Sequence, residues 1–340
     1  MKSVIAAATA LLLAVPAITP AAAQESARVA ELTFEAPSLA GNIEGNSTER
    51  TVFVVTPPGY DENTGKRYPV VYFLHGYWMP AAAQQEGFRL DEAVQAASEA
   101  GHDFIMVMPD GFSLRRGGFY SSGPTVGDYE SMVADDLVNW VDTNYRTLAD
   151  PASRGLAGHS MGGYGTARIA MQRPGIFSSI YMMSACCLEP MTITAEDAAR
   201  IEGMTEDEVA NADFAGLAQI STLATWSPDP TGEGFLKVDT GLQEDGTLDP
   251  MVNYRLAANS PIVLLPQFLP ELNGLEAFAM DIGDEDFLLE PNRLWREQLD
   301  HFGVDYDFEL YEGDHGNRIR ERIRTKVLPF FAEHLETETK

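Results

Sequence analysis

The motif G-H-S-M-G at residues 158–162 is the part of the chain most suited to chemistry. It places glycines two positions before and two positions after Ser160. Residues 154–157 are predicted to form a short buried strand before the motif, and residues 164–172 a helix after it. Glycines at these positions let a strand and a helix approach closely at a sharp turn, which presents a serine hydroxyl as a nucleophile. Because glycine and serine also occur together in ordinary turns, Ser160 needs partners elsewhere in the sequence.

A nucleophilic serine requires a histidine base, which follows the serine in the chain order of one large hydrolase class. Three histidines follow Ser160. His301 and His334 fall within stretches with helical periodicity, whereas His315 lies in a glycine-containing loop after the alternating strand predicted at residues 306–311. Catalytic groups of α/β sheets gather at the carboxyl ends of strands. The sequence therefore predicts His315 as the base.

An acid that orients the histidine is expected after the preceding strand, predicted at residues 275–282, but several carboxylates crowd this segment. Asp281 stands at the end of the strand and would brace the turn. Asp284 would cap the turn or be solvated. We favour Asp286 as the acid, with Asp284 as the alternative.

Several further motifs agree with one another, and together they resemble the esterase D family of α/β-hydrolases. They are P-P-G-Y at residues 57–60, R-Y-P-V-V-Y-F-L-H-G at 67–76, N-Y-R-T-L-A-D at 144–150, the serine motif extended to 165, and the loops at 283–286 and 313–315. The resemblance covers most of residues 28–335, except a stretch near 188–255. The family includes S-formylglutathione hydrolases, feruloyl, acetyl and siderophore esterases, and mycolyltransferases, so it indicates the chemistry and not the substrate.

The resemblance implies an α/β-hydrolase fold, with a mostly parallel central sheet, helices on both faces and a cap-like insertion. It also implies that Asp286 is the acid. The backbone N–H groups of Tyr77 and Met161 would form the oxyanion hole, which stabilises the charge that develops on the attacked carbonyl oxygen. Trp78, beside Tyr77, is a candidate for the substrate pocket, and core packing is the alternative. Trp226, in the stretch that the resemblance does not cover, is a candidate for a wall of the pocket.

Predicted strands alternate with helices along the chain, which is typical of a mostly parallel sheet covered on both sides. The strands are predicted at residues 52–56, 69–74, 103–108, 154–157, 179–185, 275–282 and 306–311. We expect residues 24–340 to form a single domain. The insertion at about 188–255 would form a lid over the site, and a surface decoration without a role in access is the alternative.

Residues 1–23 have the pattern of a cleavable signal peptide, with Lys2, a short apolar run and alanines up to position 23. The apolar run is too short to cross a bilayer comfortably, and no later run has spanning length. The sequence therefore predicts a periplasmic or secreted protein.

The net charge of −28, from 51 acidic and 23 basic residues, disfavours nucleic acids and anionic membranes as partners because it would repel both. The only cysteines, Cys186 and Cys187, are adjacent. A bridge between them would be strained, so we expect them to act as small apolar fillers. No cysteine or histidine cluster suggests a metal site, and the predicted chemistry needs no cofactor.

The sequence thus predicts a secreted or periplasmic serine esterase that hydrolyses small-molecule, lipid or sugar esters through an acyl-enzyme. An acyltransferase would use the same residues but deliver the acyl group to an alcohol. A peptidase of the same fold and a non-catalytic binding module are further alternatives, although the complete order of serine, acid and histidine disfavours the latter.

Overall fold

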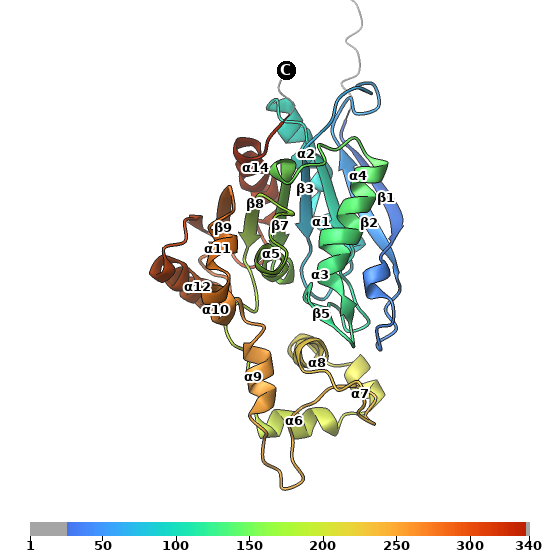
Figure 1. Cartoon of the computed structure of the whole chain (residues 1–340), viewed down its shortest axis with the longest axis vertical. Coiled ribbons are helices and arrows are strands. Elements are labelled where there is room, and N and C mark those ends of the chain that lie inside the picture. The colour runs from blue at the N-terminus through green and yellow to red at the C-terminus, as the bar shows by residue number, and fades with distance from the viewer. Residues whose placement is uncertain (1–25, 338–340) are drawn as a thin grey trace, which may run out of the picture.

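A computed structural model describes residues 26–337, so the predicted signal peptide lies outside the described residues. Its centre is an eight-stranded sheet with the order β1-β2-β4-β3-β7-β8-β9-β10 (Figure 1). The strands are β1 (Arg28–Glu35), β2 (Glu49–Thr56), β3 (Val70–Leu74), β4 (Ile105–Pro109), β7 (Arg154–His159), β8 (Ser179–Met183), β9 (Ala277–Gly283) and β10 (Asp307–Tyr311). From β4 to β10 all neighbours are parallel, whereas β1 and β2 are antiparallel additions at one edge.

The central strands are apolar on both faces because both faces are covered. In β3, Val70, Tyr72 and Leu74 enter one half of the core while Val71 and Phe73 enter the other, and all five are fully buried. A parallel strand buried on both sides reads as a continuous apolar run, which is why the sequence predicted it. The edge strand β1 was not predicted, because most of its side chains are exposed and it lacks that signal.

Two layers of helices cover the sheet, one on each face (Figure 1). One layer holds α1 (Ala81–Phe88), α2 (Leu90–Glu99), α13 (Ile319–Arg322), η5 (Ile323–Val327) and α14 (Leu328–His334). The other holds α3 (Tyr129–Ser131), η2 (Met132–Leu137), α4 (Val138–Asn144), α5 (Met161–Gln172) and α12 (Leu289–Phe302). Short elements complete this region, namely η1 (Pro37–Leu39), β5 (Ser122–Gly123), β6 (Gly127–Asp128) and η3 (Pro151–Ser153).

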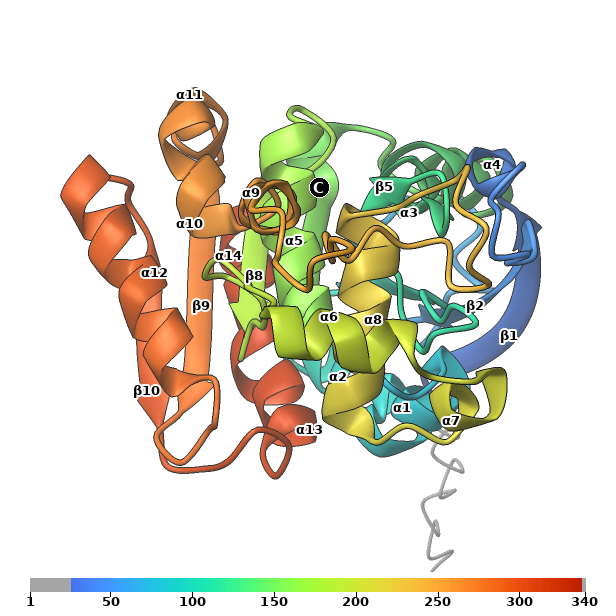
Figure 2. The same ribbon diagram turned by 90° about the horizontal axis from the view of Figure 1, so that it is seen from below.

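A group of helices follows β8 and lies beyond one end of the sheet (Figures 1 and 2). It comprises α6 (Ala195–Glu202), α7 (Glu206–Ala210), α8 (Phe214–Trp226) and α9 (Met251–Ala257), and we call it the helical insertion. The chain returns to β9 through α10 (Pro261–Leu264), η4 (Leu265–Gln267) and α11 (Leu269–Leu272). Seen from that end, α6 and α8 lie in front of α5 and the sheet (Figure 2).

Polar contacts fasten the helical insertion to the loops at the carboxyl ends of the strands. Ser221 of α8 donates a hydrogen bond to the carbonyl oxygen of Gly117 at 2.7 Å, and Arg115 donates to the carbonyl oxygen of Leu236 at 2.8 Å. The insertion therefore lies over the edge of the sheet where the predicted catalytic residues stand. In the part of the chain from 26 to 337, no helix is long and apolar enough to cross a membrane.

Candidate active site

Ser160 occupies the sharp turn between β7 and α5, in a strained backbone conformation with positive φ (φ 58°, ψ −115°). The flanking glycines are sterically required there. A Cβ atom on Gly158 would lie 2.3 Å from the backbone of Gly162, and one on Gly162 would lie 1.9 Å from the carbonyl oxygen of Leu74. Only glycine permits this approach, so the motif has the steric origin that the sequence predicted.

The three predicted catalytic side chains form one hydrogen-bonded chain. Ser160 Oγ lies 3.0 Å from His315 Nε2, and His315 Nδ1 lies 2.9 Å from Asp286 Oδ2 and 3.1 Å from Oδ1. Burial raises the pKa of Asp286, but hydrogen bonds from His315 and from the Leu288 N–H outweigh burial and hold this pKa below its usual value. Asp286 therefore stays ionised and accepts a hydrogen bond from the Nδ1–H of His315, which leaves Nε2 free to accept the proton of Ser160.

The other two acids of this segment have different partners. Asp284 accepts a hydrogen bond from the backbone N–H of Gly313 at 3.0 Å and so ties the acid loop to the histidine loop. Asp281 is fully buried and accepts hydrogen bonds from Tyr181 at 2.8 Å and Arg322 at 2.7 Å. Burial raises its pKa to about 6. Of the three candidates, Asp286 is the one that the structure places against His315.

The loop after β3 passes beside Ser160 and is held by one buried glutamine. Gln84 of α1 accepts a hydrogen bond from the Gly76 N–H at 2.9 Å, and it donates to the carbonyl oxygens of Gly76 at 2.8 Å and Met79 at 2.9 Å. A Cβ atom on Gly76 would lie 3.4 Å from the Cβ of Ser160. The loop that carries Tyr77 is thus fixed at close range to the serine, and Met161 follows the serine directly as the first residue of α5.

We predict that Gln84→Ala lowers kcat for p-nitrophenyl acetate by about tenfold to a hundredfold and changes KM little. The reason is that the loop that carries the predicted oxyanion donor, the N–H of Tyr77, loses three hydrogen bonds, while this N–H itself remains. Steady-state kinetics measures the split between kcat and KM. The matched control is Gln85→Ala on the same helix, since Gln85 is equally buried but its Oε1 has no hydrogen-bond partner within the described chain. Equal losses in both variants would mean that α1 acts only through general stability.

A cavity of ≈570 Å³ opens beside Ser160 and His315, and its lining is mainly apolar. The apolar side chains around it are Tyr77, Met79, Ala83, Phe88, Phe214, Phe287 and Ile319. Phe214 comes from the start of α8 and Phe287 directly follows the acid. These two rings are 50% and 67% exposed, and the ring centroid of Phe287 lies 4.6 Å from that of His315.

The sequence analysis missed both of these aromatic residues. The position of Phe287 next to Asp286 was the available signal, whereas nothing in the sequence distinguishes Phe214. Trp78 does not reach the cavity lining but supports it, because its ring lies 5.6 Å from that of Phe214. The prediction that Trp226 forms a wall of the pocket is wrong.

Trp226 instead joins the helical insertion to the core. It is only 5% exposed, its indole N–H donates to Ser121 Oγ at 3.1 Å, and its ring packs against Phe119 and Tyr164 at 5.2 and 5.5 Å. A tryptophan at the end of an otherwise apolar helix buries more surface in this way than it would by lining a cavity open to water.

His159, the residue before Ser160, supports the histidine loop. It is buried, its Nε2–H donates to the carbonyl oxygen of His315 at 2.8 Å, and the two rings lie 4.7 Å apart. Burial and the neighbouring His315 lower its pKa from 6.5 to about 3. His159 is therefore neutral at every pH at which the triad would work.

This depressed pKa predicts a loss of stability in acid. Below pH 6.5 the unfolded chain binds a proton at His159, whereas the folded chain does not. The free energy of unfolding therefore falls as the pH falls from 6.5 towards 3. Between pH 7 and pH 5, His159 lowers the free energy of unfolding by about 2 kcal/mol. We expect His159→Gln to show a correspondingly smaller drop in the free energy of urea unfolding over that interval. The same drop in both proteins would contradict the assignment.

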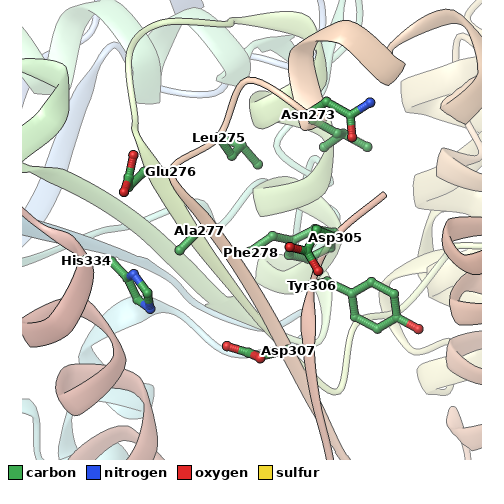
Figure 3. A pocket seen from close by; sticks show the side chains of 10 residues that line it. Asn273, Leu275, Glu276, Ala277, Phe278, Asp305, Tyr306, Asp307 and His334 are labelled. Carbon is green, nitrogen blue, oxygen red and sulfur yellow. The ribbon is translucent and has the colours of Figure 1, made fainter. Parts of the chain in front are cut away.

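A second hollow, of ≈290 Å³, lies at the amino ends of β9 and β10 (Figure 3). Its side chains include Glu276, Asp305, Asp307 and His334. It lies at the amino ends of the strands, whereas Ser160 lies at the carboxyl end of β7, and no predicted catalytic residue lines it. Within residues 26–337, no group of three or more histidine, cysteine or acidic side chains is arranged to hold a metal ion.

The mostly parallel sheet, the serine on a sharp turn after a central strand and the histidine on the loop after the last strand define an α/β-hydrolase. Residues 44–319 match the family model described as "Putative esterase". The chain belongs to this esterase family, which confirms the resemblance predicted from the motifs.

Solved structures agree on the fold. A ferulic acid esterase has a TM-score of 0.65 at 19% identity, over 92% of this chain and 100% of its own. An S-formylglutathione hydrolase of Staphylococcus aureus has a TM-score of 0.61 at 18% identity, over 90% of this chain and 99% of its own.

Two curated relatives match a shorter region. Esterase Rv1288 of Mycobacterium tuberculosis is 33% identical over 135 residues, which are 38% of this chain and 27% of that protein. An endo-1,4-beta-xylanase/feruloyl esterase of Xylanibacter ruminicola is 30% identical over 158 residues, which are 44% of this chain and 21% of that protein. The chain thus matches less than a third of the length of either relative.

Proposed function

We propose that the protein hydrolyses carboxylic esters or thioesters through an acyl-enzyme on Ser160. The observation that carries this proposal is the hydrogen-bonded chain from Ser160 Oγ to His315 at 3.0 Å and on to Asp286 at 2.9 Å. A serine hydroxyl is protonated at neutral pH and is a weak nucleophile. A histidine base that a carboxylate orients removes its proton and so activates it.

In the first half of the reaction, Ser160 Oγ attacks the ester carbonyl and His315 Nε2 takes its proton. The charge on the carbonyl oxygen would be stabilised by the backbone N–H groups of Tyr77 and Met161. His315 then returns the proton to the leaving alcohol or thiol, and the acyl group stays on Ser160. In the second half, His315 takes a proton from water as the water oxygen attacks the acyl carbonyl. His315 then returns this proton to Ser160 Oγ as the carboxylic acid leaves.

The lining of the cavity favours a neutral, apolar acyl or alcohol group. Its side chains present mainly carbon, and two of them are aromatic rings largely exposed to water in the absence of substrate. Exposed aromatic surface at a site gains free energy when a substrate covers it. Small-molecule, lipid and sugar esters with an apolar group would fit, and the pattern of residues 1–23 supports a periplasmic or secreted location.

We predict that Phe214→Ala lowers kcat/KM on p-nitrophenyl hexanoate by on the order of tenfold more than on the acetate, because a longer acyl chain covers more of the ring. The ratio of the two kcat/KM values in each protein checks this. Phe235→Ala is the matched control, since Phe235 lies in the helical insertion, is 44% exposed and does not line the cavity. An unchanged ratio in Phe214→Ala would mean that this residue of the helical insertion does not contribute to the preference for acyl-chain length.

The direct test is hydrolysis of p-nitrophenyl esters from acetate to palmitate, and of a ferulate ester, together with labelling by a fluorophosphonate. We expect hydrolysis and covalent labelling of one serine. Adding an alcohol acceptor separates the alternatives, because a transferase would release acylated alcohol in place of free acid. A folded protein that neither labels nor hydrolyses any ester would overturn the proposal in favour of a binding module.

A further inference from the structure

The only two cysteines of the chain are in contact with each other, and the backbone of Cys186 is hydrogen-bonded to that of Ser160. Cys186 and Cys187 follow β8, both are partly exposed, and their Sγ atoms are 2.6 Å apart as thiols. The two thiols are therefore in direct contact.

The backbone holds the pair in this position. Cys187 has φ 58°, a left-handed conformation that makes a tight turn at the second cysteine. Before it, the carbonyl oxygen of Ala185 accepts a hydrogen bond from Asn292 at 2.8 Å. A Cβ atom on Gly163 of α5 would lie 2.8 Å from the Cβ of Ala185. The segment that carries the cysteines is thus tied to α12 and pressed against the first turn of α5.

One contact joins the pair to the predicted nucleophile. The backbone N–H of Cys186 donates a hydrogen bond to the carbonyl oxygen of Ser160 at 3.1 Å. Ser160 is in a strained conformation, and such a conformation persists only when its surroundings enforce it. The turn at Cys186 and Cys187 is one of the elements that enforce it.

We propose that Cys186 and Cys187 are a site of reversible oxidation, at which a disulfide-type oxidant such as oxidised glutathione converts the two thiols into a bridge between adjacent residues. The close spacing of adjacent Cα atoms, which argues against a permanent bridge, makes this bridge strained and easily reduced. Strained disulfides are the labile and regulatory ones. This inference concerns a site separate from the catalytic residues and does not depend on the substrate.

The chemistry balances as two thiol–disulfide exchanges. Burial and the neighbouring Cys187 raise the pKa of the Cys186 thiol well above its usual value, so Cys186 is a poor first nucleophile. The Cys187 thiolate attacks the glutathione disulfide, forms a mixed disulfide and releases one glutathione. Cys186 then loses its proton and attacks Cys187 Sγ, which closes the bridge and releases the second glutathione. The two thiol protons end on the two glutathione molecules, which are reduced as the cysteines are oxidised.

The bridge would act on the nucleophile through the turn. With both cysteines as thiols, the Cys186 N–H already donates to the Ser160 carbonyl oxygen at 3.1 Å. Closing the strained bridge would draw the sulfurs together and shift the turn that carries this N–H. We therefore expect oxidation to lower the catalytic rate and the midpoint temperature of unfolding, and reduction to restore both.

The test is to equilibrate the full-length protein with oxidised or with reduced glutathione, quench with acid, and alkylate free thiols before mass spectrometry. Because the chain has only two cysteines, an internal bridge can only be this one. We expect the oxidised protein to be unalkylated and about 2 Da lighter than the thiol form, since two hydrogens leave. The reduced protein should be alkylated at both positions. Mass and alkylation are independent of esterase activity, so failure of the proposed function would not affect this result.

The single variants Cys186→Ser and Cys187→Ser serve as controls, since they cannot form an internal bridge. The double variant Cys186→Ala/Cys187→Ala should lose the response of rate and melting temperature to reductant. Two free thiols after equilibration with oxidised glutathione would overturn the proposal. So would glutathione retained on both cysteines, or a bridge found only between two chains on a non-reducing gel.

Discussion

Ser160→Ala is expected to lower kcat/KM for p-nitrophenyl acetate by on the order of a millionfold, to the level of residual catalysis by binding and the oxyanion hole. In the proposed mechanism the hydroxyl becomes acylated, and it lies 3.0 Å from His315 Nε2, which would activate it. The loss should appear in kcat, because the cavity and the loop of Tyr77 remain. Steady-state kinetics with purified wild type and variant, with contaminating esterases excluded by inhibitor, measures it.

Fluorophosphonate labelling gives the same variant a second readout. Wild type should incorporate one label, and Ser160→Ala none. Ser47→Ala, an exposed serine in the loop before β2, should label and hydrolyse like wild type. Circular dichroism should show that Ser160→Ala is folded, since the position stays free of clashes. Labelling that survives in the variant would assign the nucleophile to a different residue and end the present mechanism.

The sheet was predictable because its parallel strands are buried on both sides. Residues 69–74 read as a nearly continuous apolar run, and β3 occupies Val70–Leu74. The antiparallel edge strand β1 was not predictable from apolar content, because its exposed side chains give an edge strand the pattern of a polar loop. The stretch around His334 was predicted to be helical, and the structure places His334 at the end of α14, the last of the consecutive helical segments α13, η5 and α14.

The residues of the site differ in how strongly the sequence specifies them. Ser160 is marked by glycines that the geometry requires, and His315 stands in a loop while its competitors stand in helices. The acid was ambiguous, because three aspartates lie within six residues of one another and only the course of the turn decides which one reaches the histidine. Pocket residues were the least predictable. They come from loops and from the helical insertion, where packing decides which aromatic ring faces water. In α8, for example, Phe214 is half exposed whereas Trp226 is buried.

Asp286→Asn is expected to lower kcat by on the order of 10⁴-fold with little change in KM. Asparagine keeps the size of the side chain, but its amide group would donate to His315 Nδ1 and so leave the proton on Nε2, where it faces Ser160 and prevents proton uptake. The effect is one of tautomer and not of packing, because Asp286 is buried and an isosteric side chain fills the same space.

Asp284→Asn is the matched comparison from the same turn. Its Oδ1 can still accept the hydrogen bond from the Gly313 N–H, so we expect its kcat to stay within roughly tenfold of wild type. Measuring both variants on the same ester, with melting temperatures to exclude unfolding, separates the two aspartates. If Asp284→Asn lost more activity than Asp286→Asn, the histidine loop would have to rearrange in solution so that Asp284 reaches His315. The close pairing of Gly283 with Gly313, where a Cβ atom would lie 2.1 Å from a carbonyl oxygen, opposes such a rearrangement, and this argues for Asp286.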